Sequence, residues 1–278
     1  MGLGVRTATG VFRPDTLVFY RSLIQMMILL PWLKSYLSGG EPFAKRFRIH
    51  LVRGFFGMFA IFFFYLALQH NPLALVNLLT MTQVFWTALL SWIFLKEEVS
   101  PKQLAAATLT CVGLGLSLID PGHTSTWELN LAGILAALLC AIFSAIALTT
   151  VRSMRKRLGA REIVFFFGLS GVLMSFPVFL LRPQFPVGFE QWRLILWIGF
   201  AGGIAQILMT AGYKYTKTMI GTLALSVQLP VNLVLGYYFL QESPPAYFLF
   251  GAAIAILGIF GLVAQTRHQV GEEQRQGR

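Results

Sequence analysis

Apolar residues along this chain run in long, nearly unbroken stretches separated by short polar segments. A helix needs about 17 to 25 apolar residues to cross a hydrocarbon layer roughly 30 Å thick. Stretches near that length predict transmembrane helices over residues 16–33, 54–68, 72–95, 103–119, 129–151, 163–181, 194–213, 219–240 and 246–264. The predicted fold class is therefore an all-α integral membrane protein with nine full transmembrane helices visible.

The composition agrees, because 56% of the residues are hydrophobic and 12% are charged. Globular domains average about 45–50% apolar and 25% charged residues. The formal net charge of +11 could indicate nucleic-acid binding. However, the basic residues lie in short loops between apolar stretches, where they set membrane topology. No nucleic-acid partner is expected.

Glycines, a glutamine and a glutamate recur at a fixed distance along the chain. The pairs that lie 145 residues apart are Gly54 and Gly199, Gly57 and Gly202, Gln83 and Gln228, Glu97 and Glu242, and Gly113 and Gly258. A shift of 146 aligns the earlier residues Arg6 with Arg152 and Pro31 with Pro177. These matches predict two repeats, residues 1–122 and 123–266, followed by a tail at 267–278.

The second repeat contains five apolar stretches, whereas the first shows four. The chain is therefore expected to begin inside a truncated first helix, and a full form would have ten. Because five is odd, the two repeats should run through the membrane in opposite senses, a plan typical of secondary transporters.

Lys and Arg divide unevenly between alternate loops, with 17 on one side and four on the other. This bias predicts a multi-pass protein of the plasma (inner) membrane with a cytoplasmic C-terminus.

Several motifs resemble a known family. They are "FYRSL", "RGFFGMFAIFFFYLALQHNPLALVNLL" and "FLKEEVSPKQLAAATLTCVGLGL", and the second repeat carries "YTKTMIGTLALSVQLPVNLVLGYYFLQESPPAYFLFGAAIAILGIFGLV". They resemble the EamA-like branch of the drug/metabolite transporter (DMT) superfamily. The resemblance implies ten helices in two inverted five-helix repeats, and transport of metabolites such as amino acids.

Polar residues follow one face of the 72–95 stretch. These are Asn77, Thr80, Gln83, Thr87 and Ser91, spaced by three or four residues. The neighbouring stretches add Tyr65, Gln206, Thr210, Gln228 and Asn232. One interpretation is a water-accessible pocket that binds a polar solute. The other is hydrogen bonding between helices. Trp86 and Trp197 could form an aromatic wall or simply pack.

Arg21 is the one charge predicted to lie well inside an apolar stretch. It could pair with an anionic group of the substrate, or it could snorkel to the interface or donate to backbone carbonyls. Glu97 and Glu242 end corresponding stretches, and each is predicted to stabilise the turn into the helix that follows it, with gating or ion coupling as the alternative.

No catalytic, metal or cofactor site is expected, because the apolar stretches hold no cluster of His, Asp, Glu or Cys. All four histidines are assigned to loops or tails. The function favoured is a secondary transporter of small polar metabolites that exports by alternating access. The alternatives are a non-transporting protein that binds lipid or a partner, and an intramembrane enzyme. The expected partners are a small-molecule solute and the lipid bilayer, and a homodimer is left open.

Overall fold

A computed structural model describes residues 2–33, 43–95, 100–118, 130–216, 218–225, 228–242 and 244–258. These residues form helices joined by short turns, without a strand among them. The helices are α1 (Gly2–Ala8), α2 (Pro14–Leu29), η1 (Leu30–Trp32), α4 (Phe43–His70), α5 (Leu73–Thr80), α6 (Gln83–Leu90), η2 (Ser91–Leu95), α7 (Pro101–Leu118), α8 (Leu131–Arg155), α9 (Ala160–Leu181), α10 (Gly188–Gly212), α11 (Thr218–Leu225) and α12 (Gln228–Leu240). A last helix covers Ala246–Gly258.

Five segments are long and apolar enough to cross a membrane. They are Phe47–His70, Leu73–Phe94, Leu131–Arg155, Ala160–Leu181 and Gly188–Gly212. Large apolar side chains such as Leu181 and Phe189 point outward, with 82% and 77% of their surface exposed. Exposing such an apolar surface to water costs free energy, whereas contact with lipid does not. The all-helical membrane class predicted from the sequence agrees with these features.

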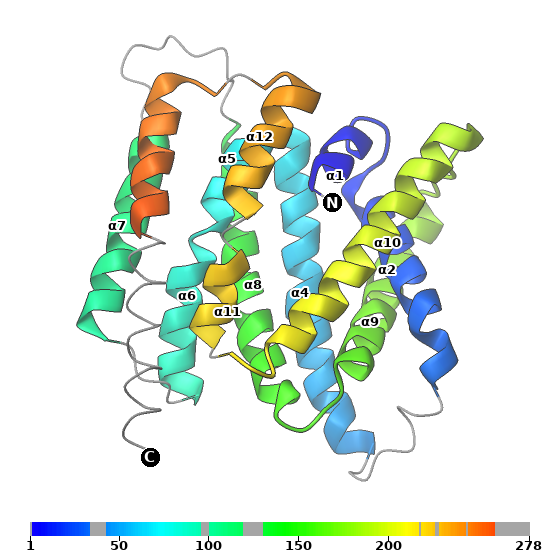
Figure 1. Cartoon of the computed structure of the whole chain (residues 1–278). Coiled ribbons are helices and arrows are strands. Elements are labelled where there is room, and N and C mark those ends of the chain that lie inside the picture. The colour runs from blue at the N-terminus through cyan, green and yellow to red at the C-terminus, as the bar shows by residue number, and fades with distance from the viewer. Residues whose placement is uncertain are drawn as a thin grey trace.

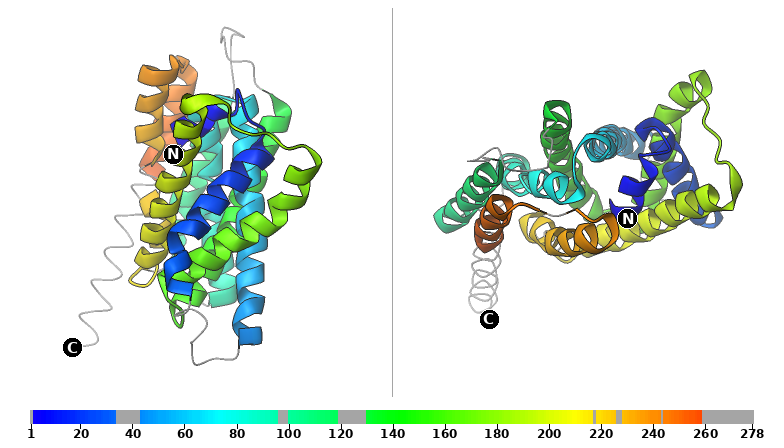
Figure 2. Two further views of the ribbon diagram at one scale, coloured as in Figure 1. Left: turned by 90° about the vertical axis from the view of Figure 1, so that its right-hand side faces the viewer. Right: turned by 90° about the horizontal axis from the view of Figure 1, so that it is seen from above.

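The helices lie side by side in a bundle with an elongated cross-section (Figure 2). α4 packs along α8, α2 packs along α9, and α10 crosses α2. In Figure 1, α4 and α9 run upward while their sequence counterparts α10 and α2 run downward. α7 and the last helix, also counterparts, likewise run in opposite directions.

Glycines allow some of these helices to come close together. At Gly113 in α7, an added Cβ would lie 2.7 Å from the Gly251 carbonyl oxygen and 2.9 Å from Ala255 Cα. A Cβ added at its counterpart Gly258 would lie 2.8 Å from the Ala106 carbonyl oxygen. The absence of a side chain therefore sets the spacing between α7 and the last helix.

The start of α4 differs from the prediction. The sequence placed the helix at 54–68 and assigned Arg53 and His50 to a loop, but α4 begins at Phe43. Both side chains are buried, and His50 lies 3.4 Å from Glu162 of α9. Charged residues interrupt an apolar pattern, yet a helix tolerates them where a neighbouring helix supplies polar or aromatic partners.

The 72–95 stretch is not the continuous helix predicted. It breaks at Met81–Thr82 into α5 and α6. Near the break, the hydroxyls of Thr80 and Thr82 donate to the carbonyls of Asn77 and Leu79, both at 2.9 Å. Such local bonds compete with the helical ladder. In the corresponding 219–240 stretch, the structure describes α11 up to Leu225 and α12 from Gln228.

Candidate functional site

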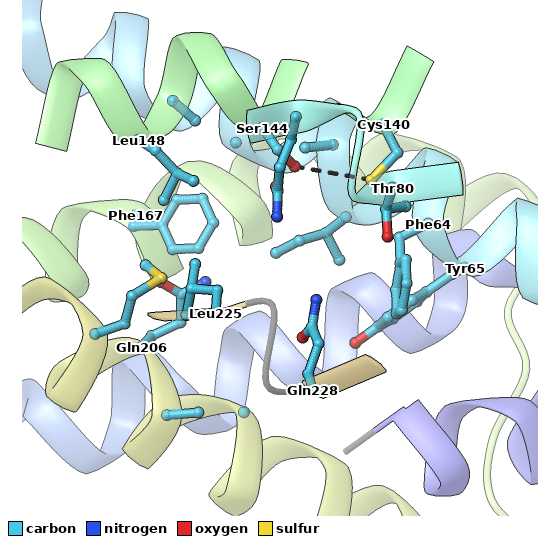
Figure 3. A pocket seen from close by; sticks show the side chains of 18 of the residues that line it. Phe64, Tyr65, Thr80, Cys140, Ser144, Leu148, Phe167, Gln206, Leu225 and Gln228 are labelled. Carbon is cyan, nitrogen blue, oxygen red and sulfur yellow. Dashed lines mark hydrogen bonds between the residues drawn. The ribbon is translucent and has the colours of Figure 1, made fainter. Parts of the chain in front are cut away.

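A cavity of about 250 Å³ lies at the centre of the bundle, between α4, α8, α10 and the helix pairs α5–α6 and α11–α12 (Figure 3). Thr80 and Gln83 line it from the two sides of the break between α5 and α6. Leu225 and Gln228 line it from α11 and α12. Broken helices at the centre of a membrane domain place polar groups where a solute could meet them.

The cavity is lined by corresponding positions of the two halves of the chain. The lining pairs 145 residues apart are Gly57 and Gly202, Ala60 and Ala205, Ile61 and Gln206, Phe64 and Met209, Thr80 and Leu225, and Gln83 and Gln228. If an axis through the cavity relates the two halves of the chain, corresponding residues of both halves lie next to the cavity.

Six of the candidate residues line the cavity, namely Arg21, Tyr65, Thr80, Gln83, Gln206 and Gln228. In Figure 3, the Tyr65 hydroxyl is directed toward Gln228, whose amide points into the cavity. The Tyr65 hydroxyl and Gln206 Oε1 are buried without a hydrogen-bond partner among the described residues. These groups are free to bind a polar solute.

Asn77, Asn232, Thr87 and Thr210 lie outside the lining. Asn232 Nδ2 donates to Asn77 Oδ1 at 2.9 Å, so these two amides join α12 to α5. Thr87 and Thr210 are fully buried, and neither hydroxyl has a partner in the described structure.

The two tryptophans considered for an aromatic wall, Trp86 and Trp197, do not line the cavity. Trp86 packs against the Phe85 ring outside the cavity, with ring centroids 5.5 Å apart. Trp197 is 61% exposed on the outer surface. Phe64 and Phe167 line the cavity instead.

Arg21 is not the only charge inside the bundle, because Arg53 also lines the cavity. The two side chains are 1% and 3% exposed, and Nε and Nη1 of each have no hydrogen-bond partner in the described part of the chain. Arg21 therefore neither snorkels to an interface nor donates these hydrogens to backbone carbonyls.

The Arg53 guanidinium lies over the Phe167 ring, 3.9 Å from its centroid. Such a contact contributes about 0.5–2 kcal/mol. An uncompensated buried charge costs several kcal/mol, so the ring contact does not offset the burial. Gly57, one turn after Arg53, leaves the space that the guanidinium occupies. In the sequence, the glycine four residues after Arg53 was the feature that could have indicated a buried arginine at this position.

Glu242 stabilises a helix other than the one predicted. Its carboxylate accepts the Leu73 backbone N–H at 2.9 and 3.1 Å, at the start of α5, rather than acting on the helix that follows it. Arg6 Nε lies 3.5 Å from the same carboxylate. A negative charge at a helix N-terminus is favourable. Glu97, its counterpart, lies outside the described residues.

Two arginines make equivalent contacts at opposite ends of the bundle. Arg6 donates to the Leu68 carbonyl at the end of α4, and Arg152 donates to the Tyr213 carbonyl at the end of α10, the latter at 2.8 Å. The arginines are 146 residues apart and the acceptors 145 apart. The sequence repeat therefore corresponds to a repeated contact.

Known proteins resemble this chain over most of its length. A model of the EamA-like transporter family matches residues 1–119 and 131–264. The pseudopaline exporter CntI of Pseudomonas aeruginosa is 25% identical over 93% of this chain and 89% of its own. A riboflavin transporter of Brucella anthropi is 26% identical over 90% and 87%. Human solute carrier family 35 member G1 is 25% identical over 86% and 68%.

The fold also matches a crystal structure of a protein, with a TM-score of 0.70 and 22% sequence identity, over 95% of this chain and 92% of that one.

Proposed function

This chain belongs to the EamA-like transporter family, and we propose on that premise that it exports a small polar solute by alternating access through the central cavity. Its relatives are named as transporters rather than enzymes. The observation that carries the proposal is a cavity lined by corresponding residues of both halves, several of which hold polar groups without partners.

We propose that the two halves form inverted repeats. Three observations support this: the family matches each half separately, the counterpart helices α4 and α10 run in opposite directions, and Arg6 and Arg152 make equivalent contacts. Inverted repeats allow a protein to expose one central site to either face.

The orientation that we propose has the lower end of Figure 1 in the cytoplasm. The start of α4, the end of α8 and the start of α9 lie there, and they carry Arg48, Arg155 and Arg161. Removing Arg53 from the loop count leaves 16 basic residues on this side, that is 17 less one, against four. The bias therefore still favours a cytoplasmic C-terminus.

We propose that polar contacts close the outer end of the cavity. Asn77 and Asn232 join α5 to α12, and Glu242 holds the start of α5. The positions corresponding to these asparagines are Thr222 and Thr87. Thr222 contacts the Tyr213 hydroxyl at 3.2 Å, and the Thr87 hydroxyl has no partner in the described residues. The two ends thus differ, and opening would require breaking the hydrogen bond between Asn77 and Asn232.

Replacing the paired glutamines tests the proposal without knowledge of the solute. Cells that overproduce the protein should accumulate its solute in the medium, and metabolite profiling would identify it. Gln83→Ala and Gln228→Ala should each lower this export about tenfold, because a lost hydrogen bond of about 1.4 kcal/mol corresponds to that factor.

Gln69→Ala serves as the control, because Gln69 is an exposed residue of α4 outside the cavity. Export that is equal in all three variants would remove the cavity from the transport path.

A further inference from the structure

Two positive charges face the cavity without a counter-ion. Arg21 comes from α2 and Arg53 from α4, and the lining described contains no Asp or Glu. Neither guanidinium forms an ion pair with a described residue. Among the described residues, therefore, no side chain balances the two charges.

The charges belong to one half of the chain. The position corresponding to Arg21, 146 residues later, is Phe167, and that of Arg53, 145 residues later, is Ile198. Phe167 lines the cavity and supports Arg53. Corresponding positions of both halves therefore line the cavity, while its charge is concentrated on the side of α2 and α4.

The neutral groups around the arginines also favour an anion. The Tyr65 hydroxyl, which lines the same cavity as Arg21, is buried without a hydrogen-bond partner among the described residues. Gln83 and Gln228 add amide donors to the same cavity. Carboxylates and phosphates accept several such hydrogen bonds at once, and guanidinium groups bind them in a bidentate manner.

We propose that the transported solute is a small organic anion whose carboxylate or phosphate binds between Arg21 and Arg53. This inference rests on the proposed transport function and specifies its substrate class. The cavity of about 250 Å³ lies below the range of about 300–1,000 Å³ typical of sites for drug-sized ligands, which indicates a small metabolite. The rest of the solute would contact the α10–α12 side, where Gln206, Met209 and Leu225 offer a mixed surface.

Thermal unfolding of the purified protein in detergent can measure anion binding with simple probes. Acetate and inorganic phosphate represent the two anionic groups, and acetamide is the neutral match of acetate. A ligand that binds the folded state raises the melting temperature by mass action. Near ten times its dissociation constant, a bound probe should raise it by about 3–6 °C. The larger of the acetate and phosphate shifts identifies the preferred group.

In the wild type, acetate or phosphate should raise the melting temperature more than acetamide does. In Arg21→Gln and Arg53→Gln this difference should disappear. Arg193→Gln should keep it, because Arg193 lies on the surface with 66% of its side chain exposed. This control also accounts for any general stabilisation by salts. Without a probe, the two cavity variants should melt at or above the wild-type temperature, since each removes an uncompensated charge.

Equal shifts for acetate, acetamide and phosphate in the wild type would overturn the inference, whether or not the variants fold. An anion shift of the same size in the cavity variants and in Arg193→Gln would also overturn it. Export that depends on Gln83 and Gln228 would then still support transport of another solute class. Conversely, an anion shift that depends on Arg21 and Arg53, without such export, would leave an anion site and contradict the transport function.

Discussion

Export should fall to background when Ala205 is replaced by tryptophan. Ala205 lines the cavity and belongs to an exposed position of α10, so a large side chain can enter the cavity without displacing a packed neighbour. An indole in place of a methyl group would occupy much of the 250 Å³ and exclude the solute. The export assay on cells or vesicles measures the loss, and thermal unfolding checks that the fold is retained.

Ile204→Trp provides the matched control. Ile204 precedes Ala205 in α10, is 53% exposed and does not line the cavity. This variant should export as the wild type does, because its indole faces the surroundings of the bundle. If Ala205→Trp folds and exports normally, the solute does not pass through the cavity.

Cross-linking α5 to α12 should stop export reversibly. The Asn77 and Asn232 amides meet at 2.9 Å, so Asn77→Cys with Asn232→Cys places two thiols within reach of a short bifunctional methanethiosulfonate reagent. The background carries Cys111→Ala and Cys140→Ala, which removes the native thiols. The linked protein cannot open its outer end, so export should cease, and reductant should restore it.

Each single cysteine variant, treated with the same reagent, controls for modification alone. Gel mobility or mass spectrometry gives the fraction that is linked. Export that continues in fully linked protein would show that this end does not open during transport.

The sequence predicted the membrane class and family because both depend on patterns that survive without tertiary contacts. Long apolar stretches and repeated glycines are visible in any alignment of the chain with itself. Hydropathy also found the polar face that contains Thr80 and Gln83, because periodicity of 3.6 places such residues on one side of a helix.

The remaining features depend on contacts between elements distant in the sequence. Arg53 was missed because a charge interrupts an apolar stretch, and only the ring of Phe167 and the space at Gly57 explain its burial. Glu242 was assigned to the wrong helix because its partner, the Leu73 N–H, is 169 residues away. The break between α5 and α6 depends on local hydroxyl bonds that hydropathy does not register.

The most direct test of alternating access is the accessibility of a single cysteine in the cavity from each face of the membrane. Ser144→Cys, with Cys111→Ala and Cys140→Ala, places one small thiol on the cavity wall. A membrane-impermeant methanethiosulfonate reagent is applied to right-side-out or inside-out vesicles, and the labelled fraction is measured. Labelling from both faces is the predicted result, whereas labelling from one face only, or from neither, would contradict it.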